Sequence, residues 1–295
     1  MPPCGGMRPS YPSDLAEFAV LAPGLPSPCA RGRPWKHPPR AVLDGVFYVV
    51  RTGCQWRWLP REYPPWPTVY WWFSRWRRDG TWERLNAAPR ERVRRALGRD
   101  PQPSAGIVDS QTVRTSAVGG VRGFDGAKRV SGRKRHVLVD TLGLVLKAVV
   151  HPADVQDRAG VPLPLDGIAR AFPRLEHVWL DQGYTGSGVA WIAEHLGWST
   201  EVVQHPRAGG GGVRGVADPT QPHGVRIETV AGRVSRGFQG PLPRRWTVER
   251  TFSWLLHSRR LARDYERLTA TDEALVYAAM TRLMVRRLAR QRRSR

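Results

Sequence analysis

The sequence predicts a mixed α/β protein in which a small all-helical domain precedes a larger domain with a mixed β-sheet flanked by helices. Apolar residues recur at helical spacing between residues 40 and 98. Three segments rich in β-branched residues then follow one another, and after them strand patterns alternate with helix patterns. A chain of 295 residues can hold both units, so we place the helical domain at residues 40–100 and the sheet domain at residues 104–295.

Residues 1–39 have a composition that opposes a packed element. They are rich in Pro and Gly, which disfavour regular structure, and they end in the basic stretch Arg31–His37. We therefore expect a flexible basic N-terminal arm ahead of the helical domain.

The helical domain is expected to contain three helices in an arrangement like that of helix-turn-helix proteins. The first spans Arg40–Arg51, where apolar residues fall on one face. Thr68 can cap a second helix that ends at Arg78. Thr81 looks like another cap, and the helix after it continues to about residue 98 with a kink at Pro89.

The sheet domain is expected to begin with three strands and to continue with alternating helices and strands. The expected strands are Ile107–Asp109, Arg135–Asp140, Leu144–Val150, Val178–Leu180 and Glu201–Val203. The expected helices are Asp157–Phe172, Gly188–Leu196, Trp246–Arg263 and one that begins at Thr271. Residues 207–240 contain a glycine run and show no periodicity, so we expect a flexible insertion there.

The charge of the chain favours a nucleic acid as its partner. The 47 Lys and Arg residues outnumber the 25 Asp and Glu residues, which leaves a formal charge of +22. Arginine dominates the excess, and its planar guanidinium binds phosphate with two hydrogen bonds. Long apolar runs and a secretory signal are absent from the sequence, so we expect no membrane association and a cytoplasmic location.

Three acidic residues are candidates for chemistry. Asp109 and Asp181 each follow an apolar segment, which places a carboxylate at or near the exposed end of a buried strand. Glu249 lies among cations beside the apolar face of a helix. Taken singly, each aspartate is also compatible with a turn or helix cap, and the glutamate with a surface salt bridge.

Together these acids predict a metal site for phosphoryl chemistry. Two strand-end carboxylates and one helical carboxylate can hold two Mg²⁺ ions about 3.5 to 4 Å apart, an arrangement that serves in-line displacement at phosphorus. Mn²⁺ is an acceptable substitute for Mg²⁺ at oxygen ligands. Such a site needs no covalent protein nucleophile. His136 and His151 flank predicted strands without companion ligands, and we interpret both as structural.

Several motifs in the correct order resemble those of bacterial DDE transposases, and most closely those of the insertion-sequence-five family. In the sheet domain the motifs are Val108–Gln111, Gly132–Asp140, Val155–Arg158, Asp181–Tyr184 and Arg244–Phe252. In the helical domain they are Phe47–Trp56 and Trp66–Tyr70. The resemblance spans most of the chain.

The resemblance implies both a fold and an activity. It implies a ribonuclease-H-like catalytic domain in which Asp109, Asp181 and Glu249 are the catalytic and metal-binding acids, with Arg245 as a basic position of the signature. It also implies an enzyme that binds the terminal inverted repeats of an insertion sequence and catalyses metal-dependent strand cleavage and strand transfer. Double-stranded DNA, at the element ends and the target, is then the partner, and a homodimer on the nucleoid is expected when two ends are paired.

The chain departs from the family pattern in three places. Leu242 and Leu256 occupy spacings at which related transposon families carry Tyr and Lys around the glutamate. Residues 1–40 and 207–240 also fit the family poorly, and the second stretch lies between the second and third acids. Two alternatives therefore stay open, namely a non-enzymatic DNA-binding protein or repressor and an inactive relic.

Several basic residues are candidates for contacts with DNA phosphates. They are Arg133, Lys134, Arg135, Arg245, Arg250, Arg259 and Arg260. A solvated surface face is the alternative interpretation of the Arg133–Arg135 and Arg259–Arg260 clusters. The helical segment around Trp71 and Arg75 could dock against DNA, whereas the i, i+4 spacing of Trp72 and Trp76 indicates core packing.

Overall fold

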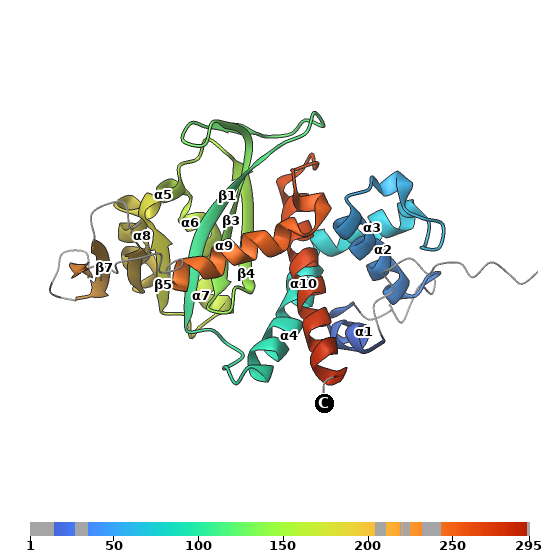
Figure 1. Cartoon of the computed structure of the whole chain (residues 1–295), viewed down its shortest axis with the longest axis horizontal. Coiled ribbons are helices and arrows are strands. Elements are labelled where there is room, and N and C mark those ends of the chain that lie inside the picture. Colours follow the sequence, from blue (N-terminus) through green and yellow to red (C-terminus); the bar gives the residue numbers. More distant parts are fainter. Residues whose placement is uncertain are drawn as a thin grey trace, which may run out of the picture.

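The computed structural model describes residues 15–26, 35–203, 211–218, 220, 225–231 and 243–293. Within this part of the chain, eight strands form one mixed sheet, with helices on both faces and a helical region at one end (Figure 1). The predicted class, a mixed α/β domain preceded by helices, is confirmed.

The described residues of the helical region form four α-helices. They are α1 Leu15–Leu21, α2 Pro39–Thr52, α3 Trp66–Arg78 and α4 Thr81–Ala96, with 3-10 turns η1 Ala22–Gly24 and η2 Trp56–Trp58. α3 begins two residues before the predicted cap Thr68, because Pro67 fits a first helical turn, where its missing N–H costs nothing. Thr81 lies inside α4 and Gly80 precedes it with φ 72°, so the predicted cap is wrong. Pro89 lies within α4, which continues on either side of it.

α1 corrects part of the expected flexible arm. Val20 and Leu21 are buried in the main core, where α1 packs against α4 and α10 (Thr269–Arg293). Leu21 is 1% exposed, so this segment contributes to the fold and the expectation of a flexible arm is wrong for it. Residues 1–14 and 27–34 lie outside the described part of the chain.

The sheet places its parallel strands at the centre. The strands are β1 Ala105–Arg114, β2 Gly123–Asp125, β3 Val130–Asp140, β4 Val145–Pro152, β5 His177–Asp181, β6 Ser199–Val203, β7 Gly211–Ala217 and β8 Val225–Ala231. Their order is β2-β3-β1-β5-β6-β7-β8, with β4 also paired to β3. β5 is parallel to both β1 and β6, and the other pairs are antiparallel.

The hairpin of β7 and β8 corrects the expected flexible insertion. β7 pairs antiparallel with β6, and β8 with β7, so these residues extend the sheet. The glycines of β7 removed the alternating pattern by which a strand is recognised in a sequence. Other residues of the 207–240 stretch lie outside the described part of the chain.

The remaining helices cover the two faces of the sheet. They are α5 Asp157–Gly160, α6 Pro162–Leu165, α7 Ile168–Ala171, α8 Ser187–Leu196, α9 Pro243–Leu256 and α10, with 3-10 turns η3 Gln182–Tyr184 and η4 Arg259–Leu261. The single helix predicted over Asp157–Phe172 is three short helices, because Pro162 begins a new one and Gly167 takes a left-handed φ of 67°. None of the described helices is both long and apolar enough to cross a membrane.

The core consists of two apolar clusters, one on each face of the sheet. Val108, Leu138 and Leu180 face α5 to α8 in the smaller cluster. The larger cluster joins Val137 of β3 to α9, α10 and the helical region, where Trp82 belongs to it. The core of the helical region is therefore continuous with the core of the sheet.

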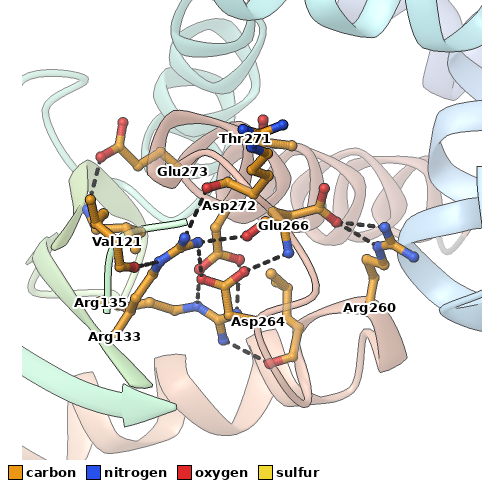
Figure 2. A network of polar contacts seen from close by, with 12 residues as sticks. Val121, Arg133, Arg135, Arg260, Asp264, Glu266, Thr271, Asp272 and Glu273 are labelled. Atoms are coloured by element: carbon orange, nitrogen blue, oxygen red, sulfur yellow. Dashed lines mark hydrogen bonds and ion pairs between the residues drawn. The ribbon is translucent and has the colours of Figure 1, made fainter. Parts of the chain in front are cut away.

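Strand β3 is also fastened by buried ion pairs, which Figure 2 shows. Arg135 donates from Nε and Nη2 to both carboxylate oxygens of Asp272 at 2.6 and 2.8 Å, and from Nη1 to the Leu261 carbonyl. Arg133 donates to Asp264 Oδ2 at 2.7 Å and to three backbone carbonyls. Both arginines are 0% exposed. These contacts attach the segment between α9 and α10, and the first turn of α10, to β3.

These positions correct the expected role of four cations. The predicted phosphate contacts of Arg133, Lys134 and Arg135 are wrong, because all three side chains are buried and hold carboxylates of this chain. Arg260 is buried as well, and its Nε donates to Glu266 Oε1 at 2.8 Å. The partners of Arg133 and Arg135 lie more than 100 residues away, so the sequence around these arginines did not indicate that they are buried.

Replacing Arg135 by Met should lower the free energy of unfolding by about 3 to 5 kcal/mol, because the buried carboxylate of Asp272 loses its partner. Denaturant unfolding followed by circular dichroism measures the loss. Arg99→Met, at an exposed arginine, is the matched control and should change stability by less than about 0.5 kcal/mol. An Arg135→Met protein as stable as the wild type would contradict this role of the ion pair.

Candidate active site

The pairing of β1 with β5 places two aspartates side by side. Ile107 lies opposite Trp179 in the parallel register, and two residues further along each strand are Asp109 and Asp181. Because side chains of a strand alternate between faces, both acids lie on the face of Ile107 and Trp179. Both also line one pocket, together with Val248 of α9. The structure thus brings two of the three predicted acids together.

The position of Asp109 within its strand differs from the prediction. Asp181 is the last residue of β5, as expected, but Asp109 is the fifth residue of a ten-residue strand. β1 continues to Arg114 because its polar second half pairs with β3. Its pairing with β5 ends at Ile107, and this leaves the edge of β1 open beside Asp109.

The two carboxylates are oriented in the same way. Asp109 Oδ1 accepts a hydrogen bond from the backbone N–H of Ser110 at 2.7 Å. Asp181 Oδ1 accepts one from the backbone N–H of Gln182 at 2.6 Å, which caps η3. Both side chains are half-buried. Each acid is therefore held by the residue that follows it and remains accessible from the pocket.

The third predicted acid lies on the helix that covers this pocket. α9 runs across the sheet and packs on β1 and β5 (Figure 1). Glu249 is half-buried on α9 and follows Val248 of the pocket wall. Among the described residues, no group of three or more His, Cys, Asp or Glu side chains is placed to hold a metal ion. The structure therefore does not join Glu249 to the two aspartates as a third ligand.

The donor set of the pocket suits a hard divalent cation. Asp109 and Asp181 supply carboxylate oxygens, which are the ligands that Mg²⁺ and Mn²⁺ prefer. The other side chains that line the pocket are apolar, and they come from β1, β5, β6 and α9. Low polarity around a carboxylate pair strengthens its attraction for a cation. The residues present therefore fit a metal held by the two aspartates.

Asp157, for which no role was predicted, supports the opposite face of β1. Asp157 Oδ1 accepts hydrogen bonds from Ser110 Oγ at 2.8 Å and from Lys134 Nζ at 2.9 Å. Burial opposes ionisation of Asp157, but these two hydrogen bonds outweigh it and the pKa of its carboxyl lies below the ordinary value. The signal available in the sequence was the motif Val155–Arg158.

A buried chain of three side chains links β3 to the turn after Asp181. His136 Nε2 lies 2.9 Å from Tyr184 Oη, and His136 Nδ1 lies 2.7 Å from His151 Nε2. Burial and the neighbouring His151 lower the pKa of His136 to about 3, so its imidazole is neutral. Burial and the charge of Asp109 raise the pKa of Tyr184 well above its ordinary value. The structural role expected of both histidines is confirmed.

The outer face of α3 combines aromatic rings with arginines. Tyr70 and Trp71 are 40% and 48% exposed, and the Arg75 guanidinium lies 5.4 Å from the centre of the Trp71 ring. Arg78 continues this exposed face one turn later. Trp76 is 0% exposed, which confirms its predicted place in the core. We call Tyr70, Trp71, Arg75 and Arg78 the α3 face.

The other predicted DNA contacts have different surroundings. Arg259 is exposed on η4. Arg250 is half-buried, donates to the Leu142 carbonyl at 3.1 Å and lies over the Trp254 ring. Arg245 falls in the first turn of α9, and its side chain is outside the described part of the structure.

The buried neutral histidine predicts a loss of stability in mild acid. Unfolded His136 binds a proton below about pH 6.5 and folded His136 only near pH 3, so the unfolded state gains protons as the pH falls through this range. Between pH 7.5 and 5.5 the free energy of unfolding should drop by roughly 1.4 kcal/mol from this residue. Urea titrations at pH 7.5 and 5.5 measure the slope.

His136→Gln should reduce this pH dependence, because a neutral amide cannot be protonated in this range. His195→Gln is the control, since His195 is exposed and its replacement should leave the slope as in the wild type. Equal slopes in the wild type and the His136→Gln protein would show that the histidine is not held neutral.

Comparison with known proteins adds a family to this geometry. Residues 100–284 match the sequence family described as "Transposase DDE domain". Residues 14–86 match the family described as "Putative transposase of IS4/5 family". The chain is also 32% identical over 108 residues to the "Insertion element IS402 uncharacterized 16.2 kDa protein" of Burkholderia cepacia, and the alignment covers 35% of this chain and 72% of that protein. The first match spans β1, β5 and α9, which carry the three candidate acids.

Proposed function

The chain belongs to the transposases with a DDE domain, and from this premise we propose that Asp109, Asp181 and Glu249 are its catalytic acids. The family makes the protein an enzyme that cleaves DNA and transfers the cut strands during transposition. Its sheet and flanking helices are the ribonuclease-H-like fold of that domain. The assignment of the three residues and of their metal ions is our proposal.

One observation carries the assignment of the acids. The parallel register of β1 and β5 puts Asp109 and Asp181 on one face, and both line the pocket that α9 closes with Val248. Glu249 is the next residue of α9. Asp109 and Asp181 therefore share one face of the sheet, and Glu249 lies on the helix that covers this face.

Divalent metal ions are the cofactors of this family. We assign to the site two Mg²⁺ ions, with Mn²⁺ as a substitute, held by Asp109, Asp181 and Glu249. When bound, such ions make water or a 3′-hydroxyl a stronger nucleophile and stabilise charge on the leaving oxygen. For Glu249 to join the two aspartates, its side chain or the adjoining turn of α9 has to move toward the pocket.

The residues of the chain itself orient the reaction. The backbone N–H groups of Ser110 and Gln182 fix the two aspartate carboxylates before any ion binds, so little ordering remains to be done. The apolar wall formed by Ile107, Val203 and Val248 limits water around the acids. A DNA hydroxyl or water is the nucleophile, and the protein forms no covalent link to the strand.

We assign the binding of DNA ends in part to the α3 face. Arg75 and Arg78 can contact phosphates, and the rings of Tyr70 and Trp71 can pack on sugars or bases. Arg259, and Arg245 and Arg250 near Glu249, extend the proposed contacts. The substrate is the terminal inverted repeat of an insertion sequence and then the target DNA. Pairing two ends calls for a homodimer, in the bacterial cytoplasm on the nucleoid.

Asp109→Asn, Asp181→Asn and Glu249→Gln should each lower the rate of DNA cleavage by roughly a hundredfold or more, because each loses charge that holds the metal ions. Labelled DNA carrying the element ends, incubated with Mg²⁺ or with EDTA, measures cleavage on a gel. Asp166→Asn, at an exposed aspartate away from the pocket, is the control and should cleave at the wild-type rate.

The same gels distinguish the remaining alternatives. Cleavage that persists in any one of the three variants would overturn the assignment of that acid. A wild-type protein that binds the element ends but does not cut them in Mg²⁺ would be a repressor or an inactive relic.

Arg75→Gln combined with Arg78→Gln should weaken the binding of element ends and make it less sensitive to salt. Each lost phosphate contact lowers the slope of log affinity against log salt concentration by about one. Fluorescence anisotropy at several salt concentrations measures the slope. Arg174→Gln, an exposed arginine beside Asp100, is the control with the same type of charge change. An unchanged slope in the double variant would remove the α3 face from the DNA contacts.

A further inference from the structure

Asp157 occupies a position behind the candidate active site that joins the surroundings of both aspartates. Its Oδ1 accepts from Ser110 Oγ at 2.8 Å and from Lys134 Nζ at 2.9 Å. A Cβ atom built on Gly183 would lie 3.6 Å from its Oδ2, so the same carboxylate is next to η3. Asp157 thus contacts the residue after Asp109 and lies against the turn after Asp181.

The two neighbours of Asp157 belong to the segments that orient the acids. Ser110 turns its Oγ to Asp157, while its backbone N–H donates to Asp109 Oδ1. Gly183 follows Gln182, whose backbone N–H donates to Asp181 Oδ1. Ser110 lies on the face of Val108, toward α5, whereas Asp109 lies on the face covered by α9. Asp157 therefore acts on the acids from behind, through the backbone.

Close packing fixes α5, which carries Asp157 at its first residue. A Cβ on Gly160 would lie 2.4 Å from His136 Cε1, so α5 approaches β3 as closely as a glycine allows. A Cβ on Gly188 of α8 would lie 2.8 Å from Val161 Cγ2, at the other side of α5. Lys134 Nζ donates also to the Val155 carbonyl at 2.9 Å. The packing of α5 and the contact with Lys134 consequently fix the position of the Asp157 carboxylate.

We propose that Asp157 is a positioning residue for the metal-binding acids Asp109 and Asp181, which it aligns through Ser110 and the turn at Gly183. Lys134 holds the carboxylate from β3, and Asp157 itself contacts neither metal nor DNA. This inference rests on the proposed function of the two aspartates. Residues that support metal ligands in this way typically contribute 10- to 100-fold to metal affinity or activity.

The test compares metal binding with folding in the full-length protein. Asp157→Asn keeps the size of the side chain and removes its charge. Ser110→Ala removes the hydroxyl that donates to Asp157 and that also interacts with Tyr184, and it leaves the charge of Asp157 in place. Binding of Mn²⁺ without DNA, followed by electron paramagnetic resonance, should weaken about 10-fold or more in Asp157→Asn and in the same direction in Ser110→Ala. The double variant should be no weaker than Asp157→Asn, because both changes break one link.

Two further readouts separate positioning from a general structural role. The binding of element ends in EDTA should stay at the value of the Asp166→Asn control in both variants. The thermal midpoint should stay there in Ser110→Ala, which keeps the charge of Asp157 that pairs with Lys134. Wild-type Mn²⁺ affinity in Asp157→Asn would overturn the proposal. If Asp157→Asn fails to fold, Ser110→Ala tests the proposal instead. Wild-type Mn²⁺ affinity in Ser110→Ala would then overturn it.

The role of Asp157 can fail while the site itself stands, and the two results look different. Asp181→Asn should abolish Mn²⁺ binding if the proposed acids bind metal. Loss of Mn²⁺ binding in Asp181→Asn together with full binding in Asp157→Asn refutes only the positioning role. Full binding in both variants refutes the proposed metal site.

Discussion

The parallel pairing of β1 with β5 is the constraint on which the rest of this structure depends. It sets Ile107 against Trp179, and therefore sets Asp109 beside Asp181 on one face. A shift of one residue would turn one aspartate to the other face, since the side-chain period of a strand is two. The antiparallel partner β3 holds β1 on its other edge over nine residue pairs, from Gly106 to Arg114, and so protects this register.

The two faces of strand β3 support different parts of the structure around the acids. Arg133 and Arg135 point toward the C-terminal segment and bind Asp264 and Asp272, which fixes the chain between α9 and α10. Buried ion pairs contribute little net stability after desolvation, but a misplaced segment would leave unpaired charges, so they specify position. Lys134 and His136 point the other way and support α5 and the turn at Tyr184.

Much of this architecture could be predicted from local patterns in the sequence. The apolar spacing of residues 40–51 gave α2 nearly to the residue, and an apolar segment before an acid gave the end of β5. The motifs led to Asp109 and Asp181, which the structure brings to one pocket. Their place on adjacent strands was not predicted, because the pairing of β1 with β5 joins segments that are far apart in the sequence.

Several failures share a physical cause, which is that the deciding partner lies far away in the sequence. Arg135 was expected on the surface because its partner, Asp272, lies 137 residues later and the residues near Arg135 give no sign of it. Asp109 was expected at a strand end because polar residues follow it, yet Ser110 is satisfied by Asp157. The role of Asp157 itself depends on the packing of α5 against β3, which no spacing encodes.

Metal-directed cleavage of the polypeptide tests most directly whether Asp109, Asp181 and Glu249 form one metal site. Fe²⁺ takes the place of Mg²⁺ at oxygen ligands and, with ascorbate and peroxide, cuts the polypeptide near the site where it is held. With element DNA bound, we predict fragments that end close to Asp109, Asp181 and Glu249, and their loss when excess Mg²⁺ competes. Cuts at the two aspartates without one in α9, or cuts elsewhere, would contradict a single site made from all three acids.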